Sequence, residues 1–169
     1  ASNINNLTSA RISNAAKCGS NFTSSNYTYP QICTYQANTA AIEASHNEGK
    51  TFIPPFNDPK IIEGQGTVGL EILQQSSAPI DYIFVPIGGG GLASGIGAVY
   101  KQMSPNTKII GVEPAGAAGM KLSFERGEVT ELDHVEKFVD GAAVQRVGDI
   151  TFDVCREVLD DISVVPEGK

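Results

Sequence analysis

Four consecutive glycines, Gly88–Gly91, separate a nearly continuous apolar run at 80–87 from a segment with helical spacing of apolar residues at 92–103. A glycine in an ordered position costs roughly 0.5–1 kcal/mol relative to alanine. A fold tolerates that cost only where the backbone must lie in a place where side chains would collide. The apolar run is typical of a strand buried on both faces in a parallel sheet. The sequence therefore predicts a glycine turn between a buried strand and a helix.

The predicted glycine turn favours the binding of an anion. At the carboxyl end of a parallel strand it exposes successive main-chain N–H groups, and the following helix presents its positive end. Together these groups form a nest for a phosphate dianion, at the edge where open α/β sheets bind ligands. A flexible linker is the alternative, but linkers are flanked by polar sequence, whereas Val85–Ile87 and Leu92–Ala93 flank this loop. We therefore expect a phosphate-binding loop at Gly88–Gly91.

From about residue 35, short apolar runs alternate with segments of helical spacing. This alternation predicts right-handed βαβ units, and hence an α/β fold with a parallel sheet and helices on both faces. The small residues at 94–98 would pack closely on that sheet. Gly64–Thr67 is interpreted as a tight turn before a helix, and Asp149 is interpreted as a helix cap. The expected strands are 51–53, 80–87, 108–113 and 162–165, and the expected helices are 37–48, 67–75, 92–103, 117–126 and 152–159.

The opening segment, residues 1–33, differs in composition from the rest of the chain. It contains six Asn, six Ser and three Thr and no acidic residue, and it has no sustained helical or strand periodicity. Such a composition is typical of a disordered or foreign lead-in. We therefore expect 1–33 to be a lead-in and 34–169 to be part of one domain.

The charge balance and the scarce metal ligands exclude several functions. Twelve Lys and Arg stand against 19 Asp and Glu, which gives a net charge of −7 and argues against nucleic acid or an anionic membrane as a partner. No apolar run is long enough to span a membrane, and a cytoplasmic protein is expected. The three cysteines have no metal-ligand spacing, Cys155 lies on an apolar helical stripe typical of a core, and His46 and His134 are predicted to be solvated.

One alternative function uses the same glycines. Gly88, Gly90 and Ala93 satisfy the G-x-G-x-x-G/A dinucleotide pattern, and Glu113 ends the following predicted strand, where a ribose-binding acid would lie. Any strand–glycine–helix–strand unit with a terminal acid produces this match. A dinucleotide-binding Rossmann-like domain therefore stays open as an alternative.

Six blocks follow one another in the sequence: Thr51–Pro59, Gly64–Thr67, Gly88–Leu92, Gly111–Pro114, Phe138–Val144 and Arg146–Asp149. Together these blocks resemble the threonine ammonia-lyase (threonine dehydratase) and serine racemase family of pyridoxal 5′-phosphate enzymes, which are of the tryptophan-synthase-β type. The resemblance covers roughly 35–169. It implies pyridoxal 5′-phosphate as the cofactor, an amino-acid substrate, a homo-oligomeric parent enzyme, and conversion of L-threonine, or L-serine, to 2-oxobutanoate, or pyruvate, and ammonia. For the L-threonine reaction, the resemblance implies a role in isoleucine biosynthesis or threonine catabolism.

The resemblance also assigns the site. The cofactor phosphate would be held by main-chain N–H groups of Gly88, Gly89, Gly90, Gly91 and Leu92. The family's cofactor-linked lysine lies in a serine-x-lysine-x-arginine-glycine-like block that no lysine of this sequence matches. We therefore assign no catalytic residue and expect an interior fragment of the catalytic domain that is inactive by itself. A non-catalytic truncated product is a further alternative.

A metal site of the serine-racemase relatives is only partly present. Glu113 matches the first acid of that site, but Gly119 stands where the second acid is expected. Because a single carboxylate is a poor site for a hard cation, no metal is predicted. Glu113 could equally be a strand-end acid that faces solvent or hydrogen-bonds the next turn.

Overall fold

The computed structural model describes residues 40–136 and 138–167, and the chain divides into two compact units, Ala1–Ile53 and Pro54–Lys169. In the first unit, residues 40–48 are helical and the helix ends before Gly49, whose φ is +64°. This confirms the helix end predicted there. The expected strand at 51–53 is wrong, because these residues have an irregular backbone and pair with no described strand. The expected lead-in, 1–33, lies outside the described residues.

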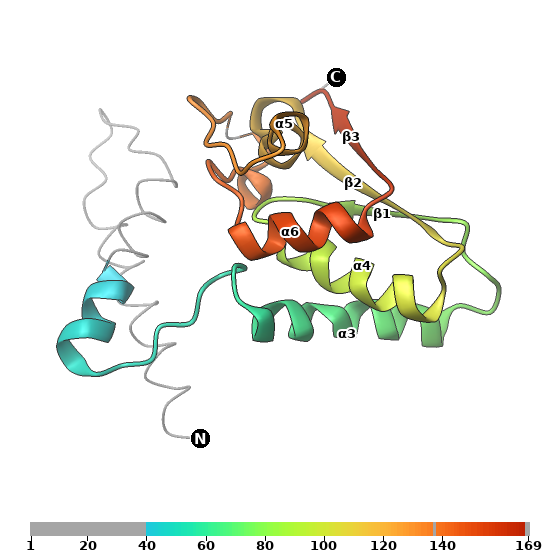
Figure 1. The fold of residues 1–169 in the computed structure, drawn as a ribbon, viewed down its shortest axis with the longest axis horizontal. Coiled ribbons are helices and arrows are strands. Elements are labelled where there is room, and N and C mark those ends of the chain that lie inside the picture. The colour runs from blue at the N-terminus through green and yellow to red at the C-terminus, as the bar shows by residue number, and fades with distance from the viewer. Residues whose placement is uncertain (1–39, 137, 168–169) are drawn as a thin grey trace. The chain divides into compact units, whose positions relative to one another are not determined.

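A parallel three-stranded sheet lies at the centre of the second unit (Figure 1). Its strands are β1 (Tyr82–Pro86), β2 (Lys108–Pro114) and β3 (Asp161–Val165), in the order β1-β2-β3. The helices are α3 (Pro59–Gln75), α4 (Gly91–Met103), α5 (Gly119–Arg126) and α6 (Asp149–Val158), with the short 3-10 turns η1 (Ala115–Ala117) and η2 (Asp140–Ala142). The alternation of strands and helices confirms the predicted α/β fold with a parallel sheet.

Strand register places the ends of β1 and β2 side by side. Val85 pairs with Gly111, and Gly111 pairs with Ile162 on the other side. The backbone pairing continues past β1, because the Ile87 amide donates to the Val112 carbonyl at 2.9 Å. The glycine loop therefore starts directly beside the carboxyl end of β2.

The two faces of β1 differ in burial. Val85 and Ile87 are buried, whereas Tyr82 and Phe84 are 60% and 65% exposed and stack on each other with ring centroids 6.5 Å apart. The expectation of a strand buried on both faces is therefore not met within the described residues. The covered face is the one against which α4 packs.

Helix α3 begins earlier than the sequence predicts. Asp58 caps it by accepting from the Lys60 amide at 2.8 Å, and Pro59 occupies its first position. Gly64–Thr67 lies inside this helix, so its interpretation as a tight turn is wrong. Gly66 is buried and faces α4, since a Cβ there would lie 3.3 Å from Val99 Cγ2. The absence of a side chain at Gly66 thus allows α3 and α4 to pack closely.

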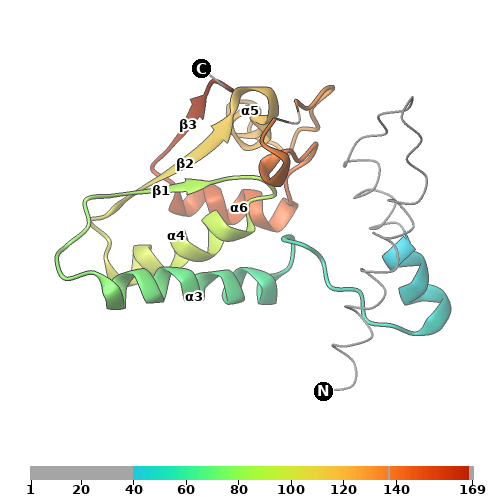
Figure 2. The ribbon, with the colours of Figure 1, turned by 180° about the vertical axis from the view of Figure 1, so that it is seen from behind.

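Helix α4 lies between α3 and the sheet, with α6 beside it, as the two opposite views show (Figures 1 and 2). A Cβ on Gly95 would lie 2.6 Å from the Ile62 carbonyl oxygen of α3, and one on Gly97 would lie 2.8 Å from Val158 Cβ of α6. Gly95 and Gly97 therefore allow close packing of α4 on two helices, whereas the sequence suggests that the small residues pack on the sheet.

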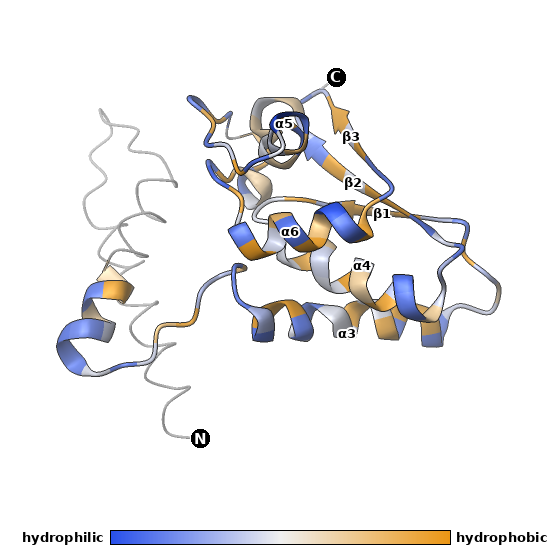
Figure 3. Cartoon of the chain, viewed as in Figure 1, coloured by the Kyte–Doolittle hydropathy of each residue, from blue (hydrophilic) through white to orange (hydrophobic). Residues whose placement is uncertain are grey.

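The core lies between the sheet and these helices. The strands carry mainly hydrophobic residues, and α6 alternates between hydrophobic and hydrophilic ones (Figure 3). Phe124 of α5 meets Phe152 of α6 edge to face, with centroids 5.8 Å apart. None of the helices in the described part has the length and apolar character that a membrane crossing requires. The buried cluster comprises Val85, Ile87, Ala93, Ile96, Tyr100, Ile109, Met120, Val147, Phe152, Cys155 and Ile162.

Candidate functional site

The predicted phosphate loop joins β1 to α4 at the carboxyl edge of the sheet. Gly89, Gly90 and Gly91 are buried, and Gly88 and Leu92 are half-buried. Gly90 is the N-cap of α4 and has a φ of +95°, in the left-handed region that favours glycine. The structure therefore places the predicted residues in one continuous turn at the start of a helix.

The amide groups of this turn are the feature that matters chemically. Within the described residues, no N–H of residues 88–93 donates a hydrogen bond, although most of these residues are buried. Buried main-chain donors are nearly always paired, and the first amides of a helix have no partner within it. The turn thus presents adjacent free donors at the positive end of α4, which suits a phosphate or another anion.

The carbonyl groups of Gly89 and Gly90 accept hydrogen bonds, and their partners include residues of α6. The Thr151 hydroxyl donates to the Gly89 carbonyl at 2.6 Å, and the Gly148 amide donates to the same oxygen at 3.3 Å. The Gly90 carbonyl accepts from the Ser94 amide at 2.9 Å and faces the Cys155 sulfur at 3.8 Å. These two carbonyl groups are therefore satisfied by the protein, whereas the amides of the loop have no partner among the described residues.

Protein groups occupy the space that side chains at the glycines would need. A Cβ on Gly89 would meet the ring of Phe56, and one on Gly90 would lie 2.8 Å from Met120 Cε and 2.9 Å from Thr151 Cβ. The sequence predicts a collision at these positions, and the structure shows that neighbouring side chains of the chain itself cause it.

The two residues after Phe56 form hydrogen bonds to the starts of two helices, α6 and α3. Asn57 Oδ1 accepts from the Ile150 amide of α6 at 2.9 Å, and Asp58 caps α3. The predicted cap of α6, Asp149, instead pairs with Arg146 at 2.7 and 3.1 Å, and the N-cap residue is Gly148, which has no side chain to bond the helix. Sequence reasoning missed Asn57 because its partner is distant in the chain.

Glu113 lies at the end of β2 and is 1% exposed. Its two carboxylate oxygens accept from the Met120 and Lys121 amides of α5, each at 2.8 Å. Burial raises the pKa of Glu113 to about 7, although these two hydrogen bonds act to lower it. The carboxylate therefore bonds the next helix and is not accessible to a ribose hydroxyl. The described residues contain no cluster of three metal-ligating side chains.

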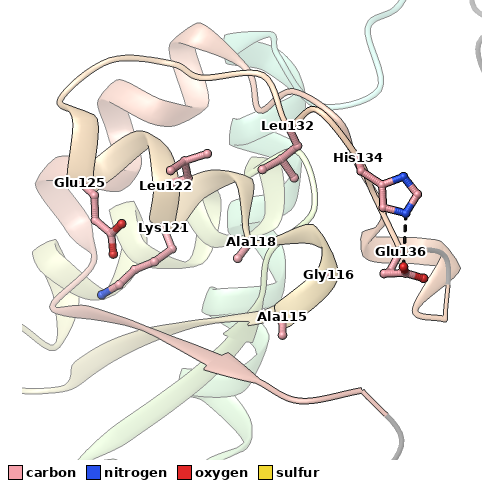
Figure 4. A pocket seen from close by; sticks show the side chains of 9 residues that line it. All are labelled: Ala115, Gly116, Ala118, Lys121, Leu122, Glu125, Leu132, His134 and Glu136. Atoms are coloured by element: carbon pink, nitrogen blue, oxygen red, sulfur yellow. Dashed lines mark hydrogen bonds and ion pairs between the residues drawn. The ribbon is translucent and has the colours of Figure 1, made fainter.

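A separate pocket of about 400 Å³ lies beside η1 and α5 (Figure 4). His134 and Glu136 bond across its rim at 3.2 Å, and the His134 side chain is 78% exposed, as the sequence predicts. His46 is also exposed, and Cys155 is buried in the core as expected. None of the predicted phosphate-binding residues lines this pocket, whose lining residues are Ala115, Gly116, Ala118, Lys121, Leu122, Glu125, Leu132, His134 and Glu136.

A parallel sheet whose first described strand ends in a buried glycine turn with free amides defines an α/β protein with donors that suit an anionic ligand at the carboxyl edge of the sheet. Residues 7–169 match the family described as pyridoxal-phosphate dependent enzyme. The chain therefore belongs to this family of pyridoxal-phosphate dependent enzymes. The match begins within the stretch that composition sets apart as a lead-in.

Within this family, the chain is similar to several individual proteins. The chain is 57% identical over 119 residues to the biosynthetic L-threonine dehydratase of Halalkalibacterium halodurans. The aligned stretch covers 70% of this chain and 29% of that protein. The structure superposes on the processed threonine deaminase isoform 2 of Solanum lycopersicum with a TM-score of 0.74 and 43% identity, over 82% of this chain and 45% of that one. The structure also superposes on maize serine racemase, with a TM-score of 0.72 and 36% identity, over 78% of this chain and 41% of that one. The chain thus spans less than a third of the length of the curated relative.

Proposed function

We propose that this chain is the cofactor-phosphate-binding part of an L-threonine ammonia-lyase. The complete enzyme would convert L-threonine to 2-oxobutanoate and ammonia, and L-serine to pyruvate and ammonia, as a cytoplasmic homo-oligomer in isoleucine biosynthesis. The single observation that supports this proposal is the set of free amides at residues 88–93, in a chain of the pyridoxal-phosphate dependent family. The identity to a relative named L-threonine dehydratase supports the choice of substrate.

The residues of the loop fit the phosphate of the cofactor. In this proposal, amides of Gly88–Gly91 and Leu92 donate to the phosphate oxygens, and the positive end of α4 offsets part of the phosphate charge. Phe56 packs on Gly89 at one side of the loop. When bound, pyridoxal phosphate supplies an electron-withdrawing ring that stabilises the charge left at the substrate Cα. The chain's own part in this reaction is to hold and orient the phosphate end.

L-serine is included because it differs from L-threonine only by a methyl group. A pocket distinguishes substrates that differ by one methyl group by only about 1–3 kcal/mol, so overlap is expected. The dinucleotide alternative has less support, because the acid that would bind a ribose, Glu113, is buried and bonded to α5.

An exchange of segments tests the proposal. The stretch of this chain that aligns with the Halalkalibacterium halodurans enzyme replaces the corresponding stretch of that enzyme, so that the host supplies the remaining residues. We expect the purified chimera to bind pyridoxal phosphate and to form 2-oxobutanoate from L-threonine. Formation of D-serine from L-serine without 2-oxobutanoate would instead indicate a racemase.

Two variants of the chimera separate the loop from general effects on folding. Gly90→Ala places a side chain at a φ of +95° and against Thr151, and we expect cofactor affinity to fall by about tenfold or more. Gly64→Ala adds the same methyl group where nothing lies within 4 Å, so it should leave affinity unchanged. A folded chimera that binds no pyridoxal phosphate, or a Gly90→Ala variant that binds it normally, would contradict the proposal.

A further inference from the structure

Thr151 is a buried residue of α6 whose hydroxyl reaches into the glycine loop. Its Oγ1 lies 2.6 Å from the Gly89 carbonyl oxygen and 3.1 Å from the Gly148 carbonyl oxygen. A threonine hydroxyl has a single hydrogen to donate. The shorter distance assigns that hydrogen to Gly89, across 62 residues of sequence.

Because the peptide bond is planar, the contact at the Gly89 carbonyl also sets the direction of the next N–H group. In a trans peptide the C=O of one residue and the N–H of the next point in opposite directions. Because the Gly89 carbonyl points to Thr151, the Gly90 N–H must point away from α6. The Gly90 carbonyl is held in the same way by Ser94 N at 2.9 Å and faces Cys155, so the Gly91 N–H also points away from α6.

A run of glycines needs such an external constraint. Glycine has no Cβ and populates both signs of φ about equally, so a peptide between two glycines can turn over at little cost. If the peptide between Gly89 and Gly90 turned over, a carbonyl would face the site where an N–H is needed. The Gly148 amide also bonds the Gly89 carbonyl, but at 3.3 Å, so the hydroxyl is the shorter of the two contacts.

We propose that Thr151 is a positioning residue for the cofactor phosphate: by holding the Gly89 carbonyl it fixes the direction of the Gly90 N–H toward the anion. This inference rests on the proposed function of the loop. It extends the site from the glycines to a hydroxyl on another helix, which does not touch the phosphate.

Thr151→Val and Thr151→Ser test this role in the full chain. Valine keeps the branched shape and removes the hydroxyl, whereas serine keeps the hydroxyl. A matched control is Thr67→Val in α3, where the Thr67 hydroxyl likewise donates to a carbonyl, that of Gly64 at 2.7 Å, away from the loop. Pyridoxal phosphate and inorganic phosphate are titrated, and binding is followed by the ¹⁵N–¹H shifts of the glycine amides.

We expect Thr151→Val to bind both ligands about tenfold more weakly, since one net hydrogen bond corresponds to roughly that factor. The Gly90 amide should then show a smaller shift at saturation, while Thr151→Ser and Thr67→Val remain within about twofold of the parent chain. A purely structural role would not change the Gly90 shift at saturation. Thr151→Ala removes the same hydroxyl and replaces the valine variant if that variant does not fold.

The outcomes distinguish the two proposals. Parent-like affinity in Thr151→Val or Thr151→Ala, or equal loss in Thr151→Ser, would overturn the role of the hydroxyl and leave the phosphate loop intact. A parent chain that binds neither pyridoxal phosphate nor inorganic phosphate would overturn the loop assignment and this inference together.

Discussion

Asn57 Oδ1 accepts a hydrogen bond from the Ile150 amide at 2.9 Å, so that a side chain located 93 residues earlier in the sequence caps the first turn of α6. The adjacent residue Phe56 packs on Gly89, and the α6 residue Thr151 bonds the Gly89 carbonyl. The glycine loop is thus held between two segments that are themselves joined through Asn57.

Asn57→Ala should destabilise the chain by about 1 kcal/mol, the usual cost of losing a helix cap. Asn57→Asp keeps the acceptor and places a negative charge near the positive end of α6, so its stability should equal or exceed that of the parent. Urea unfolding measures both variants, with Asn106→Ala at an exposed turn as the control. Equal stability of Asn57→Ala and the parent would show that the contact contributes nothing.

The raised pKa of Glu113 predicts that the free energy of unfolding depends on pH. Burial raises the pKa of Glu113 in the folded chain to about 7 from its usual value of 4.5. Its contribution is therefore fully present below pH 4.5 and is lost as the pH rises through about 7, where the buried group must ionise. The expected loss between about pH 5 and pH 8 is of the order of 1–3 kcal/mol.

Glu113→Gln removes the titrating group, so the free energy of unfolding should vary less with pH over this range. Urea unfolding at several pH values measures the difference between the variant and the parent. Glu125→Gln, an exposed glutamate of α5, serves as the matched control and should retain the parent's pH dependence. An unchanged pH dependence in Glu113→Gln would contradict the assignment.

Asp160 ties the start of β2 to the turn before β3. Its carboxylate accepts from the Ile109 amide, Lys101 and Lys108, each at 2.9 Å. Partial burial acts to raise the pKa of Asp160, but the hydrogen bonds from Ile109, Lys108 and Lys101 outweigh it and hold the pKa below its usual value.

Because the folded pKa is lowered, the stability contributed by Asp160 is present above the unfolded pKa and is lost as the pH falls through the folded pKa. Asp160→Asn should cost about 1–3 kcal/mol near neutral pH and progressively less in acid. Urea unfolding near pH 7 and near pH 3 checks this difference. A cost that is the same at both pH values would contradict a role for the charge.

Gly89→Ala should destabilise the loop because the new methyl group meets the Phe56 ring. We expect a loss of about 1–3 kcal/mol, as for other overpacked sites. In the double variant Gly89→Ala/Phe56→Ala the two changes should be non-additive, because the smaller side chain makes room for the methyl group. A thermodynamic cycle measured by urea unfolding gives the coupling, and strict additivity would show that the ring and the loop are independent.

Local signals predicted part of the fold. The helix expected at 92–103 is observed at Gly91–Met103, and the strand expected at 108–113 is observed at Lys108–Pro114, because a buried run and a helical stripe are both readable from adjacent residues. The start of α3 was not predicted, because Gly64 and Gly66 suggest a turn when they are considered alone. The packing of α4 against Gly66 and Gly69 accounts for these two glycines inside a helix, and it involves residues distant in the sequence.

The candidate loop itself was predictable, because four glycines between an apolar run and a helical stripe indicate a turn in which the backbone is closely approached. The groups that hold the loop were not predictable. Thr151 and Phe56 reach it from distant parts of the chain, and neither has a local pattern that distinguishes it from an ordinary core residue. Contacts of this kind depend on tertiary packing and carry no periodic signal in the sequence.

Three consecutive residues, Phe56, Asn57 and Asp58, each attach to a different element: the glycine loop, α6 and α3. An inserted or deleted residue here would shift at least one of these side chains out of reach of its target. Across homologous sequences this stretch should therefore be free of gaps, even where its individual amino acids vary.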